Sequence, residues 1–215
     1  MLLACWSAKG GAGTTVAAAA LALSLARRSR AGAVLADLAG DGAAVLGLPD
    51  PDSPGLAGWL AAGDDVPADA LARLEVGAGR GLALLPRGAG ALGAERAGVL
   101  AALLDAGVRP VVADCGSDLG ATTVGFLRAA DRSVLVTRLC YLALRRAVTA
   151  PVAATEVVIV HELGRVLGRA DVEAAVRVPV LAEIPADPAI ARAVDAGLLT
   201  TRLPRSLERA VRHVA

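Results

Sequence analysis

A glycine-rich segment near the start of the chain, SAKGGAGTT (residues 7–15), carries the residue types that bind phosphate groups. Gly10, Gly11 and Gly13 can adopt backbone angles that direct successive N–H groups toward an anion. A hydroxyl at Thr15 is placed to coordinate Mg²⁺ on bound phosphates. The apolar residues that follow predict a helix, whose N-terminus also favours negative charge. The segment therefore predicts a phosphate-binding loop between a strand and a helix.

The loop departs at two positions from the common phosphate-loop pattern G-x-x-x-x-G-K-[ST]. Ala8 replaces the first glycine, and Thr14 replaces the lysine. A threonine hydroxyl can donate a hydrogen bond, but it brings no charge to the β- and γ-phosphates. We therefore expect weaker nucleotide binding and slower phosphoryl transfer than a lysine would give. The alternative is a glycine-rich turn with no ligand, since ordinary α/β folds also join strand to helix in this way.

Lys9 is the only lysine among the 22 basic residues of the chain, the others being arginine. Arginine and lysine are not equivalent where a compact ammonium group must fit against a phosphate. The retention of lysine at this one position indicates a site that does not accept arginine. Chance is the alternative explanation.

The rest of the sequence alternates short apolar runs with helical patterns, which predicts an α/β doubly wound domain with a mostly parallel sheet of about seven strands and helices on both faces. We expect strands at 2–8, 33–37, 81–86, 110–115, 133–139, 156–162 and 178–184, and helices at 14–29, 94–106, 121–130, 141–149, 169–176, 187–196 and 204–214. The region 48–70 is interpreted as a loop with a short helix, so residues 1–215 are expected to form one nucleotide-binding domain. Ligands of such folds bind beyond the carboxyl ends of the strands.

Together these features resemble the ParA/MinD family of P-loop ATPases, whose deviant Walker A loop reads close to K-G-G-x-G-K-[ST]. The resemblance implies that Lys9 is the family's signature lysine, which reaches across a dimer to the partner's nucleotide. It also implies an ATP-binding loop made by Gly10, Gly11, Ala12, Gly13 and Thr14, with Thr15 as the Mg²⁺ ligand.

The resemblance extends to the segment AVLADLAGD, which is similar to the family's switch I. Asp37 matches its first acid and is a candidate catalytic residue. Ala39 falls where active members carry the acid that orients the attacking water. Asp41 lies two positions further on and could substitute for that acid in part. The alternative for Asp37 and Asp41 is that both are solvated loop acids.

Two further segments match the family. PVVADCG has the form of a Walker B strand, so Asp114 would hold the hydration shell of Mg²⁺ and Gly116 could offer its N–H to the γ-phosphate. Many α/β strands also end in Asp for helix capping, which is the alternative. In VPVLAEIPADP, Pro185 and Asp187 would flank the adenine.

Composition narrows the possible classes of protein. A net charge of +1 argues against a strongly basic nucleic-acid binder, and three widely spaced cysteines indicate reduced, buried thiols. No apolar run approaches the length of a membrane span, and no signal peptide is recognised, so we expect a cytoplasmic protein. The amphipathic segment 202–215 is expected to pack on the domain, with weak membrane contact as the alternative.

The resemblance to the ParA/MinD family implies an ATP-binding switch that forms a homodimer through its nucleotide face and positions or recruits an unknown protein partner in division, partitioning or secretion-pilus machinery. Contact with a membrane would come through that partner. Hydrolysis is expected to be slow or absent, because Thr14 and Ala39 both remove groups that assist phosphoryl transfer. The alternative is a pseudo-ATPase scaffold that has lost nucleotide function.

Overall fold

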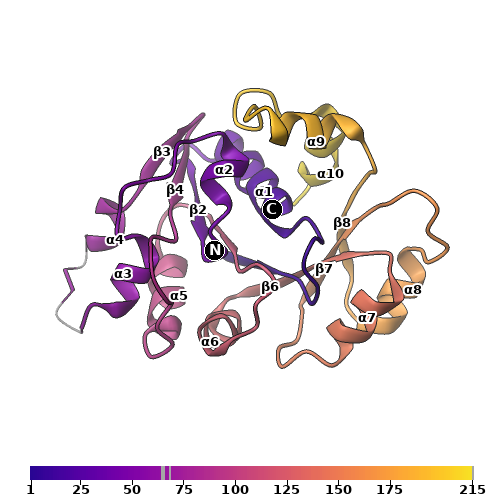
Figure 1. The fold of residues 1–215 in the computed structure, drawn as a ribbon, viewed down its shortest axis with the longest axis horizontal. Helices are drawn as coiled ribbons and strands as arrows, with labels where there is room; N and C mark the ends of the chain where they lie inside the picture. The colour runs from indigo at the N-terminus through magenta and orange to yellow at the C-terminus, as the bar shows by residue number, and fades with distance from the viewer. Residues whose placement is uncertain (64–65, 68, 215) are drawn as a thin grey trace.

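The apolar runs of the sequence form one sheet in the computed structural model, which describes residues 1–63, 66–67 and 69–214 (Figure 1). The strands are β1 (Leu2–Trp6), β2 (Ala33–Asp37), β3 (Val76–Gly79), β4 (Leu82–Leu85), β5 (Val111–Asp114), β6 (Arg132–Arg138), β7 (Glu156–Val160) and β8 (Val180–Ile184). Within this described part the sheet has eight strands, in the order β3-β4-β2-β5-β1-β6-β7-β8. All neighbouring strands are parallel except β3 and β4.

The strand pattern explains why this sheet is mostly parallel. β1, β2 and β5 consist of buried residues only, as expected for strands that helices cover on both faces. All seven expected strands are present, and the doubly wound fold is confirmed. The prediction missed β3, because its sequence VGAG holds two glycines and has little strand propensity. Antiparallel pairing with β4, interrupted by a register shift, is what makes it a strand.

Ten helices lie in the described part of the chain. They are α1 (Thr14–Arg28), α2 (Gly42–Leu46), α3 (Gly55–Ala61), α4 (Ala70–Arg73), α5 (Ala97–Ala106), α6 (Ala121–Ala129), α7 (Tyr141–Val148), α8 (Arg169–Val176), α9 (Pro188–Asp195) and α10 (Arg205–Val211). The seven expected helices are confirmed, and α3 is the short helix expected within 48–70. Residues 64, 65 and 68 of that region lie outside the described residues. Helices α2 and α4 are not among the helices expected from the sequence.

Helices cover both faces of the sheet (Figure 1). One hydrophobic core lies between the sheet and α1, α2, α9 and α10. The other lies between the sheet and α3, α5, α6, α7 and α8. Helix α1 follows the glycine loop, and its alanine-rich sequence is almost entirely buried. Small side chains let α1 approach the sheet closely, which fixes the position of the loop before it.

The C-terminal helix α10 packs on the domain, as expected, against α1 and β8. Leu203, Leu207, Val211 and Val214 are all buried in the core that α1 shares. Arg27 of α1 forms an ion pair with Glu208. Among the described residues, no helix is both long enough and apolar enough to cross a membrane.

Leu207→Ala tests whether α10 is part of the folded domain in solution. The Leu207 side chain is 0% exposed, so its truncation should lower the free energy of unfolding by about 2–5 kcal/mol in a urea titration. Leu198→Ala is the matched control, because Leu198 is 43% exposed and should cost less than about 1 kcal/mol. Equally small losses for the two variants would show that α10 does not pack as described.

Candidate functional site

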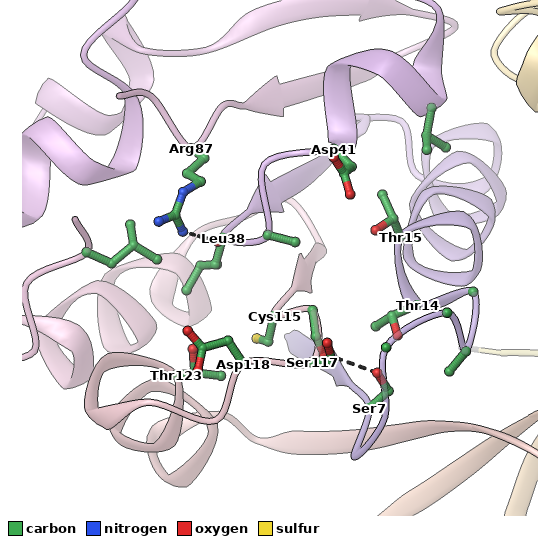
Figure 2. Close-up of a pocket in the computed structure, with 18 of the residues that line it drawn as sticks. Ser7, Thr14, Thr15, Leu38, Asp41, Arg87, Cys115, Ser117, Asp118 and Thr123 are labelled. Carbon is green, nitrogen blue, oxygen red and sulfur yellow. Dashed lines mark hydrogen bonds between the residues drawn. The ribbon is translucent and has the colours of Figure 1, made fainter. Parts of the chain in front are cut away.

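A cavity of about 1200 Å³ opens at the carboxyl ends of the central strands (Figure 2). Its walls come from the glycine loop, the segments that follow β2, β4 and β5, the start of α6 and the end of α9. Ligands of open α/β sheets bind at this edge. Figure 2 shows Thr14 and Thr15 on one wall and Arg87 across the cavity from them.

The glycine loop lines the cavity with all of its residues from 10 to 15. Gly11 and Gly13 have φ angles of 75° and 89°, a backbone conformation that favours glycine. Gly13 immediately precedes α1, so this conformation turns the chain into the helix. Thr14, the first residue of α1, is buried, and Thr15 is half-buried beside it. The loop therefore has the backbone shape that the sequence predicts.

Lys9 is half-buried and does not line the cavity. Its ammonium group lies near Cys140, the residue before α7. Backbone hydrogen bonds from Ala143 and Leu142 lower the pKa of the Cys140 thiol, and the charges of Arg165 and Lys9 lower it further. Within the described residues Lys9 forms no ion pair. The positive charge of Lys9 is thus available to a group that lies outside the cavity of this chain.

Asp114 ends β5 with a side chain that is 0% exposed. Its Oδ1 accepts a hydrogen bond from the Gly116 amide at 3.1 Å. Its Oδ2 is buried and, in the described part of the chain, has no hydrogen-bond partner. Burial raises the pKa of Asp114 from its ordinary value of 3.8 to about 6, while the nearby Thr15 hydroxyl opposes the rise.

The carboxylate of Asp114 and the hydroxyl of Thr15, which the sequence analysis assigned to Mg²⁺, therefore lie together. A buried carboxylate oxygen without a partner is costly, and a hydrated cation beside it would remove that cost. Mg²⁺ on a nucleotide usually needs only one or two carboxylates, because waters and phosphates supply the other ligands. No group of three or more His, Cys, Asp and Glu side chains in the described residues could hold a metal by itself. The residues present fit a nucleotide-bound Mg²⁺.

Asp37 ends β2 beside Asp114, its partner in the strand register. It is 2% exposed, so it is not a solvated loop acid. Its carboxylate accepts hydrogen bonds from the amides of Gly40 (2.6 Å) and Gly42 (2.8 Å), which close the turn into α2. Burial raises the pKa of Asp37. Asp37 does not line the cavity, whereas the exposed Asp41 does. A catalytic role for Asp37 stays a prediction.

Gly116 follows β5 and joins three segments of the site. Its carbonyl accepts a hydrogen bond from the Ser7 amide at 2.8 Å. Its φ is 63°, and a Cβ at this position would lie 3.1 Å from the Cβ of Ala39. Its N–H, expected to meet a phosphate, donates to Asp114 here. That expected contact stays a prediction.

Pro185 and Asp187 lie beyond β8 and do not line the cavity. The Asp187 carboxylate accepts hydrogen bonds from the Ala189 amide (2.8 Å) and the Ser206 hydroxyl (2.6 Å), so it caps α9. The Ser206 hydrogen bond is the main cause that lowers the pKa of Asp187. Val194 and Asp195 at the end of α9 line the cavity instead. A contact of Pro185 and Asp187 with adenine stays a prediction.

The cysteines differ from the expectation in one case. Cys5 and Cys115 are buried and free, as expected. Burial raises the pKa of the Cys115 thiol well above its ordinary value. Cys140 is half-exposed, because it stands in the turn before α7 and not within a strand.

Arg87 is a cavity residue that the sequence analysis missed. It follows β4, and its guanidinium donates to the carbonyls of Leu38 (2.5 Å) and Gly90 (3.4 Å). Among the described residues that line the cavity, it is the only cation. Its place just after the strand GLALLP was the available signal, because polar residues at that edge face the ligand site.

No protein-family model matches the chain, and no curated protein matches it. Solved structures do match. A ParA family ATPase from Chlorobium tepidum TLS has a TM-score of 0.81 and 20% identity over 98% of this chain and 96% of that one. The septum site-determining protein MinD of Pyrococcus horikoshii OT3, complexed with Mg-ADP, has a TM-score of 0.79 and 20% identity. That match covers 99% of this chain and 93% of the MinD chain. A MinC:MinD cell division protein complex from Aquifex aeolicus has a TM-score of 0.79 and 19% identity, and the match covers 98% of this chain and 92% of that one. The chain thus has the fold of the ParA and MinD ATPases.

The buried carboxylate at the end of β5 predicts a specific pH dependence of stability without divalent cations. Because the pKa of Asp114 is about 6 folded and 3.8 ordinarily, its ionisation makes the folded state less stable as pH rises from about 4 to above 6. Asp114→Asn removes that cost. Its free energy of unfolding should match that of the unsubstituted protein near pH 4 and exceed it by roughly 1–3 kcal/mol at pH 8.

Urea titrations in EDTA at several pH values measure this difference. Asp118→Asn is the control, because it removes an equal charge from the same cavity at an exposed position. Stability curves for Asp114→Asn and the unsubstituted protein that stay parallel from pH 4 to 8 would contradict the assignment.

Proposed function

We propose that the protein is an ATP-binding switch that binds MgATP in the cavity, dimerises through its nucleotide face and so positions or recruits a protein partner. The observation that carries this proposal is the pairing of Thr15 with the buried Asp114, whose Oδ2 has no partner within the described part of the chain. That pairing stands beside the glycine loop, whose residues 10–15 all line the cavity. The fold that holds both is the fold of the ParA and MinD ATPases.

Three features support Mg²⁺-nucleotide binding. The N–H groups of residues 10–15 and the start of α1 provide an anion site. Thr15 and Asp114 would hold the ion, which when bound neutralises part of the phosphate charge. A similar MinD structure was solved with Mg-ADP. The nucleotide is assigned as ATP from that similarity and from the family resemblance.

Slow or absent hydrolysis follows from the groups around the cavity. Thr14 brings no charge to the phosphates, and Ala39 has no carboxylate to orient a water. Asp37, the nearest preceding acid, is engaged by the Gly40 and Gly42 amides. Each missing electrostatic group of this kind typically reduces turnover by about 10²–10³. A slow switch would stay in its ATP-bound form for a long time.

Dimerisation is supported by the surroundings of Lys9. Its charge lies outside the cavity of its own chain, near the start of α7. At that helix start Tyr141 is 72% exposed, and Leu142 is also exposed. A cation without an ion pair among the described residues, bordered by exposed apolar side chains, suits contact with a second copy of the chain. The MinD of the similar MinC:MinD complex also assembles with a different protein, which supports a partner protein here.

A scaffold without nucleotide function is the second candidate. The acidic side chains of the cavity favour it: Asp41, Asp118 and Asp195 line the walls, and position 14 has no lysine to offset them. These carboxylates disfavour a polyphosphate anion. The scaffold would keep the fold and its protein partner and bind no ATP.

Sedimentation velocity with and without MgATP separates the two candidates. The unsubstituted protein should shift from monomer to dimer with MgATP, and Lys9→Arg should stay monomeric because a guanidinium does not replace the compact ammonium. Arg165→Lys is the matched control, since Arg165 is another cation near Cys140, and it should dimerise normally.

No shift in the unsubstituted protein, together with no binding at millimolar ATP, would reject the switch and leave the scaffold. A shift that Lys9→Arg preserves in full would keep nucleotide-dependent dimerisation and reject the part assigned to Lys9.

A further inference from the structure

Arg87 lies on the cavity wall across from the glycine loop (Figure 2). We propose that Arg87 supplies the positive charge that Thr14 lacks and binds the terminal phosphate of a nucleoside triphosphate, so that the site prefers the triphosphate to the diphosphate. This inference rests on the nucleotide binding proposed above. Arg87 would then distinguish the triphosphate-bound state of the switch from the diphosphate-bound state.

The charges around the cavity leave one group for this part. Three carboxylates line it, those of Asp41, Asp118 and Asp195, and Arg87 is the single cation among its described lining residues. Lys9 lies outside the cavity, and Thr14 is neutral. Among the described lining residues, a triphosphate that enters this acidic cavity therefore gains a cationic contact only at Arg87.

The guanidinium of Arg87 keeps its charge and most of its donors available. It donates to two backbone carbonyls, those of Leu38 and Gly90, and forms no ion pair with a described carboxylate. A guanidinium has five N–H donors in a planar fork that matches two oxygens of a phosphate. The carbonyls therefore orient the group without neutralising it.

The backbone around Arg87 is held on both sides. The amide of Leu56 donates to the Pro86 carbonyl and the amide of Ala57 donates to the Arg87 carbonyl, both at 2.8 Å. These two donors belong to the first turn of α3, which binds the segment directly after β4. Next to it, a Cβ at Gly88 would lie only 2.0 Å from the Pro54 carbonyl oxygen, so the two backbones cross without room for a side chain. Arg87 is thus fixed before a ligand arrives, which lowers the entropy cost of using it.

The position of Arg87 indicates which phosphate it contacts. Its bond to the Leu38 carbonyl places it at the segment that continues to Ala39, which lies against Gly116. The glycine loop occupies the other side of the cavity (Figure 2). A phosphate chain anchored in the loop would direct its last phosphate toward the wall of Ala39, Gly116 and Arg87. A diphosphate lacks that last group.

Arg87→Gln tests the proposal, because glutamine keeps a donor for the Leu38 carbonyl and removes the charge. Isothermal titration of the full chain with MgATP and MgADP gives both dissociation constants. We expect the affinity for ATP to fall about 10- to 100-fold, as for loss of a charge-assisted hydrogen bond, and that for ADP to change less than about threefold. Arg87→Lys, which keeps the charge, should retain most of the preference for ATP.

Two further variants sharpen the test. Arg128→Gln is the matched control, since Arg128 also donates to a backbone carbonyl, that of Pro151, but does not line the cavity. It should change neither affinity. In a Thr14→Lys background, Arg87→Gln should cost much less ATP affinity, because lysine then supplies the charge. The apo unfolding midpoint of each variant checks that it is folded.

Each remaining outcome decides against the proposal. Equal losses for ATP and ADP in Arg87→Gln would mean that Arg87 only supports the cavity wall. Unchanged affinities, or an equal loss with lysine at position 14, would also overturn it while leaving nucleotide binding intact. If the unsubstituted protein binds neither nucleotide at millimolar concentration, the proposed function fails first, and this inference fails with it.

Discussion

The burial of two carboxylates side by side at the carboxyl edge of the sheet is the constraint on which the site depends. Asp37 and Asp114 end adjacent parallel strands in register, where both are removed from water. The backbone satisfies Asp37 through two amides of the turn into α2. Asp114 keeps a buried oxygen that no group of the described residues satisfies. A fold that buries such an oxygen is less stable unless a cation or a proton reaches it, so the Asp114 carboxylate favours a bound cation.

The same edge connects the segments that line the cavity. The turn that Asp37 closes leads into α2, and the end of α2 contacts the end of α9. The two backbones are so close there that a Cβ at Gly47 would lie 2.0 Å from the carbonyl oxygen of Gly197. The hydroxyl of Thr200 donates to the Leu46 carbonyl at 3.1 Å and fastens the same contact. Both α2 and α9 contribute lining residues. A ligand that moves one of these helices therefore acts on the other, as the proposed nucleotide-dependent dimerisation would require.

The sequence predicts most of the fold, because strands buried on both faces leave continuous apolar runs and the helices between them keep their period. Through the loop motif and the family resemblance it also assigns Thr15 and Asp114 to one Mg²⁺, and the two side chains lie together in the structure. The burial of Asp37 could not be foreseen, because it depends on the turn geometry that brings two glycine amides to the carboxylate. Arg87 is harder to single out: its place just after an expected strand is a weak signal among 21 arginines, and only the tertiary structure shows that it lines the cavity.

A crystal structure with a non-hydrolysable ATP analogue and Mn²⁺, located by its anomalous scattering, tests the central claim most directly. We expect a Mn²⁺ peak between the Thr15 hydroxyl and the Asp114 carboxylate, with the analogue's phosphates in the glycine loop. An analogue bound with its metal elsewhere would contradict the assignment of Asp114. A cavity without analogue at millimolar concentration would contradict nucleotide binding itself.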